Sequence, residues 1–303
     1  MAPSPVAGLV YGLLFSGLLP QFVLATPLTA LGGNAPVQAL LAEPQDSVPN
    51  LLIEESVERD AVFVDSDSGE NEEDKESIFA PSWWTSTLMA RRLLALTTSG
   101  VVSTIFPDPL PPRSHAPANV AGQSISLKEY FADCDEALPT DTGNGGDGNP
   151  TFLALRVATT FRNTAAGSNI SLSIDWWDHI NKTKPVFPGF PLSAAGLPRV
   201  TLFGYIESFE TPVPRQTEAA LRSCYVNAHP DAHVWLPGRP GSPHSSFWAR
   251  MVVTQVYWIG GFGGFQQIGW MNVTEWNGIR RRGSLSGVGD GRGWEDVRLP
   301  GEN

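Results

Sequence analysis

Three histidines lie close together and are the first candidates for a metal site. His229, His233 and His244 fall within sixteen residues of the chain. A structural zinc ion takes four ligands from Cys, His, Asp and Glu side chains, and no Cys, Asp or Glu pair is spaced to complete such a set here. We therefore expect no metal ligand among these histidines and place them at a helix end and in a loop.

Two glycine-rich stretches suggest other chemistry. Asp141-Thr142-Gly143 matches an aspartic-protease triplet, and the Gly, Asp and Asn residues around it match a calcium-binding turn. A protease needs a second, paired aspartate in an apolar setting, so we favour a flexible insertion. Gly260–Gly264 (GGFGG) leaves a strand without opening a clear helix, so it is not a dinucleotide fingerprint and is expected to allow a chain reversal. We predict no catalytic residue.

The chain has only two cysteines, Cys134 and Cys224. Both lie in the part that we expect to fold, and an oxidising compartment would join them in a disulfide. Their spacing does not show contact. The alternative is two buried thiols, each packing as a small apolar side chain.

Three sites fit the rule for N-linked glycosylation, at Asn169, Asn181 and Asn272. A single sequon arises often by chance, but three on a chain with a secretory signal support modification. We favour Asn181 and Asn272, because Asn169 lies at the start of a predicted strand.

The longest predicted strand is Phe247–Ile259, in which one face is nearly all apolar and the other mixes bulky and polar side chains. Successive strand residues point to opposite faces, so this alternation is typical of a barrel or sandwich strand. Other predicted strands are Val101–Phe106, Gly122–Phe131, Thr151–Leu155, Ile170–Trp177, Val200–Phe209 and Gln266–Trp270. Predicted helices are Ser82–Thr98, Ala158–Gly167 and Gln216–Asn227. Strands that mostly follow one another without a helix predict a mainly β fold, an antiparallel barrel with flanking helices.

The charge of the chain is concentrated in one segment. The formal net charge is −11, and Glu43–Glu76 holds thirteen acidic residues against Arg59 and Lys75. The remaining eighteen acidic and eighteen basic residues cancel, so the folded part has no net charge to attract nucleic acid.

The chain ends are expected to lie outside the fold. Residues 1–25 carry an apolar run, Val6–Leu19, and small residues before Thr26, as in a secretory signal peptide; a membrane anchor is the alternative. Residues 26–79 are predicted to be a disordered acidic pro-segment. Residues 280–303, which begin with three arginines and are rich in glycine, are predicted to be a disordered tail. Most of the ten tryptophans, among them Trp176, Trp177, Trp248 and Trp258, are expected on strands in the core of residues 80–279.

Several separate blocks of sequence occur in an order that resembles one family. They are ARRLLALTTSGVVSTIF, PTFLAL followed by NISLSI, VTLFGYIESF, HPDAHVW and FWARMVVTQVYWIGGFGG. Over about Ala80–Ile279 they resemble the CREG-type secreted glycoproteins, a branch of the FMN-binding split-barrel, or pyridoxamine-phosphate oxidase-like, superfamily. The resemblance implies a six-stranded split barrel, dimers built across the barrel faces and a secretory or endolysosomal location. It does not imply a known enzyme.

The chain departs from the flavin-using relatives where they clamp the FMN phosphate with a Ser-Arg-Lys type run. Aligning PTFLAL and NISLSI puts Ala158, Thr159 and Thr160 at that place. A phosphate favours a bidentate arginine or a lysine, so these residues are a poor substitute, although Arg156 and Arg162 lie nearby in sequence. We therefore expect no cofactor and no cofactor-binding residue.

Two functions follow as expectations. The first is a secreted, endolysosomal or vacuolar glycoprotein that is non-catalytic, forms a homodimer and binds an unidentified protein or glycan, without nucleic acid or a stable membrane anchor. The alternative is an FMN- or haem-dependent oxidoreductase of the pyridoxamine-phosphate oxidase-like type. A flavin band in the visible absorbance of the purified protein would distinguish them.

Overall fold

The computed structural model describes residues 81–112, 114–139, 146–186, 189–262, 267–283 and 289–302. The predicted signal peptide, the acidic pro-segment and the Asp141-Thr142-Gly143 triplet lie outside these residues. Among the described residues, no helix is both long and apolar enough to cross a bilayer.

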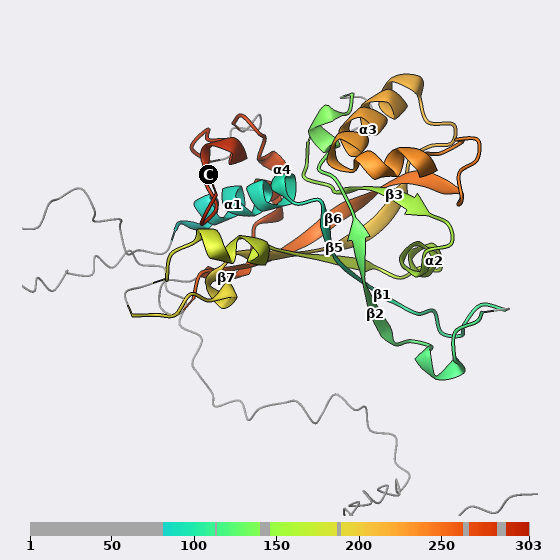
Figure 1. Cartoon of the computed structure of the whole chain (residues 1–303), viewed down its shortest axis with the longest axis horizontal. Helices are drawn as coiled ribbons and strands as arrows, with labels where there is room; N and C mark the ends of the chain where they lie inside the picture. The colour runs from blue at the N-terminus through green and yellow to red at the C-terminus, as the bar shows by residue number, and fades with distance from the viewer. Residues whose placement is uncertain are drawn as a thin grey trace, which may run out of the picture. The chain divides into compact units, whose positions relative to one another are not determined.

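The elements follow the expected order, and the described residues form seven strands and four α-helices. Figure 1 shows how they are arranged. The strands are β1 Ser99–Ile105, β2 Ser124–Tyr130, β3 Thr151–Leu155, β4 Ile170–Asp175, β5 Arg199–Ser208, β6 Ser246–Gly260 and β7 Gln267–Trp270. The helices are α1 Trp83–Leu96, α2 Thr159–Ala165, α3 Arg215–Ala228 and α4 Val273–Gly278. Every predicted strand and helix is present, and α4 is an addition. It spans only six residues, too few to show a helical period.

The fold is organised around β6, which pairs with β3, β5 and β7. Its 15 residues are longer than any other strand here. The pairing with β5 contains a bulge at Gly204, where an added Cβ would lie 1.9 Å from the carbonyl oxygen of Val252. Glycine is therefore required at this position, because the two backbones approach too closely for any side chain.

The sheet closes into a barrel. The strands run antiparallel in the order β2-β1-β4-β5-β6-β3. Past the end of β2, Ala132 and Thr151 exchange two backbone hydrogen bonds of 3.0 and 2.8 Å, which joins β2 to β3 and completes the circle. The predicted fold class, a split-barrel-like antiparallel β-barrel with flanking helices, is confirmed.

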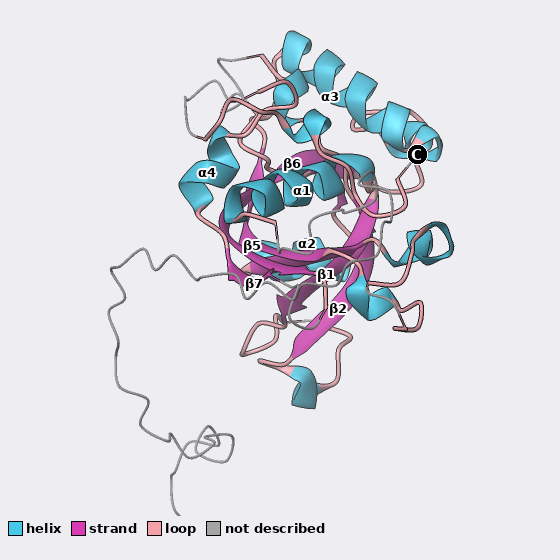
Figure 2. Ribbon diagram, turned by 90° about the vertical axis from the view of Figure 1, so that its left-hand side faces the viewer, coloured by secondary structure: helices cyan, strands magenta, loops and turns pink. Residues whose placement is uncertain are grey.

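Helix α1 packs against the barrel and begins where Ser82 caps it, with the Ser82 hydroxyl accepting from the Thr85 N–H at 3.1 Å. Leu93 and Leu94 of α1 are fully buried in the main core. Figure 2 shows α1, α3 and α4 gathered on one side of the strands. Helix α1 and the segments that contact it therefore lie on this side of the sheet.

The strand predicted as Ile170–Trp177 ends earlier, at Asp175. The Asp175 carboxylate accepts from the Trp177 N–H at 3.0 Å and turns the chain into a short 3-10 helix, Trp177–Lys182. As a result Trp176 is buried but Trp177 is 45% exposed. The expectation of a core strand residue was wrong for Trp177.

The expectation of an unfolded tail after residue 280 is also corrected. Trp294, Val297 and Leu299 are buried, and Trp294 belongs to a small core with Leu88 of α1. Arg92 of α1 donates to the Glu302 carboxylate, with Nε 2.7 Å from Oε2. The glycines suggested disorder, but the apolar residues after them bury enough surface to fold this segment onto α1.

Candidate functional site

The position of the phosphate clamp lies at the start of α2. Ala158 precedes the helix and Thr159 and Thr160 are its first residues. Thr160 is buried, and its hydroxyl donates to the Oε1 atom of Glu129 on β2 at 2.6 Å. Burial raises the pKa of Glu129, and the hydrogen bond from Thr160 acts against that rise. The clamp position therefore holds a hydroxyl and a carboxylate.

No cation completes this position within the described chain. The described contact of the Glu129 carboxylate is the Thr160 hydroxyl. Arg156 is exposed and lies over the Phe247 ring, 4.8 Å from its centroid. A phosphate placed at Thr160 would face the Glu129 carboxylate, so this pair does not fit an FMN phosphate. Arg162 lines the neighbouring cavity together with Thr159.

A cavity of about 740 Å³ adjoins the other side of α2. It is lined mainly by apolar side chains of the connection between β1 and β2, with Thr159, Arg162 and His115 among its polar residues. This size and mixture are typical of small-molecule sites.

The three histidines do not converge. His229 is buried, its Nε2–H donates to the carbonyl oxygen of Phe131 at 2.8 Å, and its ring stacks on Tyr130. The His233 Nδ1–H donates to the Pro230 carbonyl oxygen at 2.7 Å, and His244 is exposed. Among the described residues, no three His, Cys, Asp or Glu side chains are grouped to hold a metal ion.

Cys134 and Cys224 form a disulfide in the structure, with their Cα atoms 5.8 Å apart. It ties the start of a short 3-10 helix, Asp135–Ala137, to α3. A second core surrounds the bond, including Tyr225 and Trp248. The disulfide therefore fixes α3 to the barrel.

The sequon asparagines Asn169, Asn181 and Asn272 are all exposed. Asn272 also caps α4, because its Oδ1 atom accepts from the Thr274 N–H at 2.9 Å. That bond leaves the Asn272 side-chain nitrogen, to which a glycan attaches, unengaged by the cap.

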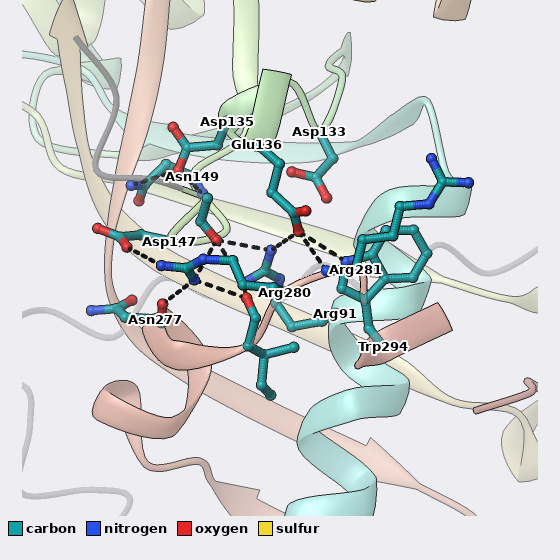
Figure 3. Close-up of polar contacts among 12 residues, drawn as sticks. Arg91, Asp133, Asp135, Glu136, Asp147, Asn149, Asn277, Arg280, Arg281 and Trp294 are labelled. Carbon is teal, nitrogen blue, oxygen red and sulfur yellow. Dashed lines mark hydrogen bonds and ion pairs between the residues drawn. The ribbon is translucent and has the colours of Figure 1, made fainter. Parts of the chain in front are cut away.

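A cluster of charged side chains around the buried Arg91 was not predicted from the sequence. We call it the acid–arginine cluster, and its members are Arg91, Asp133, Asp135, Glu136, Asp147 and Arg280. Figure 3 shows Asp133, Asp135 and Glu136 on the same side of Arg91. The only signal for it in the sequence is that Arg91 and Arg92 are the sole charges in the apolar helix Trp83–Leu96.

Arg91 holds this cluster together through the backbone. Its side chain is 0% exposed, and Nη1 donates to the carbonyl oxygens of Trp276 at 3.0 Å, Ile279 at 3.1 Å and Gly146 at 3.2 Å. Its Nη2 lies 3.7 Å from the Glu136 carboxylate. Burial lowers the pKa of Arg91, while the neighbouring carboxylates raise it. Arg91 therefore joins α1 to two segments that are distant in sequence.

Glu136 links the cluster to the C-terminal segment. Its Oε1 atom accepts from the Arg281 N–H at 2.8 Å and from the Trp294 Nε1–H at 3.2 Å. On the other side, Asp147 lies 3.6 Å from Arg280, whose Nη1 donates to the Gly146 carbonyl oxygen at 3.0 Å.

The outer face of the sheet carries exposed aromatic and aliphatic side chains. The register places Val101, Ser173, Thr201, Tyr257 and Trp270 in one row across β1, β4, β5, β6 and β7. Trp270 is 58% exposed and contacts both Tyr257 and Phe203 of this face. We call this surface the outer aromatic face.

The closed antiparallel barrel with flanking helices places the protein among split β-barrel proteins. The family model described as "CREG, beta-barrel" matches residues 83–277. The chain belongs to this CREG β-barrel family.

Solved structures give weaker likenesses. A heme binding protein from Mycobacterium smegmatis is 18% identical and has a TM-score of 0.43, covering 65% of this chain and 60% of its own length. A FAD-binding protein from Mesorhizobium loti is 16% identical, with a TM-score of 0.32 over 56% of this chain and 90% of its own. A pyridoxamine 5'-phosphate oxidase-related, FMN binding protein from Nostoc punctiforme is 13% identical, with a TM-score of 0.31 over 60% of this chain and 84% of its own. The chain thus spans 60% of the length of the Mycobacterium protein. A comparison with curated proteins gives no significant match.

Proposed function

We propose that the protein is a non-catalytic CREG-like glycoprotein of the secretory route, in the extracellular space or in the endolysosomal or vacuolar lumen, that acts by binding a partner. The observation that carries this proposal is the Thr160–Glu129 hydrogen bond at the clamp position. In this bond the Thr160 hydroxyl, which a phosphate would need as a donor, already donates to the Glu129 carboxylate. A dianionic phosphate would then meet repulsion where its relatives provide cations.

The absorbance of the purified full-length protein tests the absence of a flavin. The proposal expects a colourless protein whose visible spectrum has no flavin band after purification from a secretory host. A yellow protein that releases FMN on denaturation would overturn it.

The first partner we propose is a second copy of the chain, bound through the outer aromatic face. Such a large exposed apolar surface on a sheet is characteristic of association sites. Phe203 of β5 and Trp270 of β7 both belong to it and contact each other at a centroid distance of 5.5 Å. A further protein or glycan partner would bind outside this face.

Light scattering tests the dimer. The wild-type chain is expected to have twice the monomer mass at micromolar concentration, and Trp270→Glu is expected to have the monomer mass. Val157→Glu is the matched control, because Val157 is 56% exposed but lies between β3 and α2; this variant should remain dimeric. A monomeric wild-type protein would contradict the dimer.

Glycosylation would support the secretory route. The three sequon asparagines are exposed, as a glycan requires. Intact-mass analysis before and after glycosidase treatment is expected to show loss of at least one glycan from protein made in a secretory host. An unchanged mass would remove this support.

A flavin-dependent oxidoreductase of the pyridoxamine-phosphate oxidase-like type is the second candidate function. The cavity of about 740 Å³ beside α2 favours it, because Arg162 on its wall supplies a positive charge. A flavin held there would be detected by the same visible spectrum.

A further inference from the structure

The acid–arginine cluster lies where three distant parts of the chain meet. Arg91 comes from α1, the carboxylates come from residues 133–147, and Arg280 follows α4. Glu136 binds both Arg281 and Trp294. The described C-terminal segment, residues 289–302, therefore depends on this cluster for part of its attachment to α1.

The cluster contains more acid than base. Within the cluster, Glu136 forms an ion pair with Arg91 and Asp147 forms one with Arg280. Arg250 of β6 also acts on the charge of Asp135 and forms an ion pair of 2.7 Å with Glu207. The cluster thus has an excess of negative charge when every carboxylate is ionised.

Two carboxylate oxygens in the cluster have no hydrogen-bond donor among the residues that the structure describes. They are the Oδ1 atoms of Asp133 and Asp135, and both are buried. Asp135 satisfies its other oxygen with the Asn149 side chain at 3.3 Å. A buried anionic oxygen without a donor is unfavourable, and adding a proton removes that cost.

We propose that the acid–arginine cluster is a proton-operated latch, which fastens residues 289–302 to α1 more tightly in mildly acidic solution than at neutral pH. A proton taken up by Asp133 removes its repulsion with Asp135 and Glu136. Glu136 then accepts the hydrogen bond from the Trp294 indole N–H without electrostatic repulsion from Asp133. The lumenal compartments proposed above are acidic enough to reach this range, but the latch itself does not depend on the proposed function.

The electrostatics of Asp133 agree with the geometry. Burial raises the pKa of Asp133 from 3.8 to about 6; Arg91 lowers it, and Glu136 and Asp135 raise it further. Burial also raises the pKa of Asp135, against the opposing effects of Asn149, Arg250 and Arg91. Since a protonated Asp133 no longer repels Glu136 in the closed state, we expect the latch to be stabilised as the pH falls through about 6.

The ion pairs of the C-terminal segment itself persist at pH 5. Hydrogen bonds from Arg281 lower the pKa of Glu295. Burial acts to raise the pKa of Glu302, but the hydrogen bonds from Arg92 and the Leu299 N–H outweigh it, so this pKa is lowered as well. Acidification to pH 5 therefore changes the cluster and leaves these contacts in place.

Amide hydrogen exchange of the full-length protein tests the latch. Exchange is measured by mass spectrometry at pH 5 and pH 7, and protection factors for peptides within 289–302 are corrected for the intrinsic rate at each pH. Because the pKa of Asp133 is about 6, protection is expected to be higher at pH 5 than at pH 7, by at most about tenfold, the limit reached if opening exposes Asp133 completely. Peptides of β5 and β6 report the pH dependence of the barrel for comparison.

The variant Asp133→Asn tests whether Asp133 is the group that takes up the proton. This variant has the shape of a protonated aspartate, so its protection in 289–302 is expected to be the same at both pH values. Asp178→Asn is the matched control, because Asp178 is exposed on the 3-10 helix after β4; it should keep the wild-type difference between the two pH values. The proposal is overturned by wild-type protection that is independent of pH or lower at pH 5, or by an Asp133→Asn variant that keeps the wild-type difference.

Discussion

The clamp position at α2 and the acid–arginine cluster at α1 are both buried polar sites, but they use charge in opposite ways. At α2, Glu129 is satisfied by a neutral hydroxyl and has no cationic partner within the described chain. At α1, a fully buried arginine is satisfied mainly by backbone carbonyl oxygens. The buried positive charge of this protein therefore lies where the chain segments are joined.

This difference shows that the barrel and the polar sites on it are set by different residues. A barrel needs tight strand pairing and a packed core, and these are kept without a phosphate clamp. Arg156 and Arg162, which lie near α2, are exposed. Of the described buried arginines, Arg91 binds the backbone at Trp276 and Ile279, and Arg92 binds Glu302. A shared fold thus leaves the site free to change.

The largest effect is expected when the buried cation is removed. Arg91→Ala leaves the Trp276 and Ile279 carbonyl oxygens and Glu136 without their partner. Breaking a buried charged network costs about 3–5 kcal/mol, so we expect a loss of about 4 kcal/mol in the free energy of unfolding at pH 7. Urea unfolding followed by tryptophan fluorescence measures it.

Arg162→Ala is the control for that change, because Arg162 is exposed on α2. Its loss is expected to be below about 0.5 kcal/mol. Equal effects of the two substitutions would show that burial of Arg91 does not stabilise the fold.

The disulfide next to the cluster is expected to have the second largest effect. It joins residues 90 apart in sequence, and replacing Cys134 and Cys224 together by serine should reduce stability by about 3 kcal/mol. Thiol titration of the denatured, unreduced wild-type protein is expected to find no free thiol. Two free thiols per chain would exclude the bond.

A smaller effect is expected at the clamp position. Thr160→Ala removes the one donor to Glu129, and a lost hydrogen bond to a buried carboxylate costs about 1–2 kcal/mol at pH 7. Burial already raises the pKa of Glu129, and the substitution raises it further. Since a protonated Glu129 no longer needs the donor, the difference from wild type should shrink as the pH falls below the Glu129 pKa. Urea unfolding at pH 7 and pH 4 tests this, and a loss that grows on acidification would contradict it.

The barrel could be predicted from the sequence because its strands alternate along their whole length. Phe247–Ile259 shows this period over more than ten residues, and the observed strand β6 differs by one residue at each end. The helix from Ser82 was equally clear, since Ser82 caps it and apolar residues recur along one side. Residues close together in the chain determine where such elements begin and end, so the sequence is sufficient to predict them.

The acid–arginine cluster could not be predicted, because its members come from segments up to 189 positions apart in the chain, Arg91 to Arg280. No local period relates them. The C-terminal segment was expected to be unfolded for a similar reason: Trp294 is surrounded by glycine and charged residues, and only contact with Leu88 shows it to be part of a core.

FMN titration is the most direct test of the central claim that the clamp position does not hold a flavin phosphate. Purified full-length protein is added to a fixed concentration of FMN, and the fluorescence of the flavin is followed to a large excess of protein. Our account predicts that the fluorescence stays unquenched. Saturable quenching at one FMN per chain, which Thr160→Ala strengthens by removing the competing hydrogen bond, would contradict it.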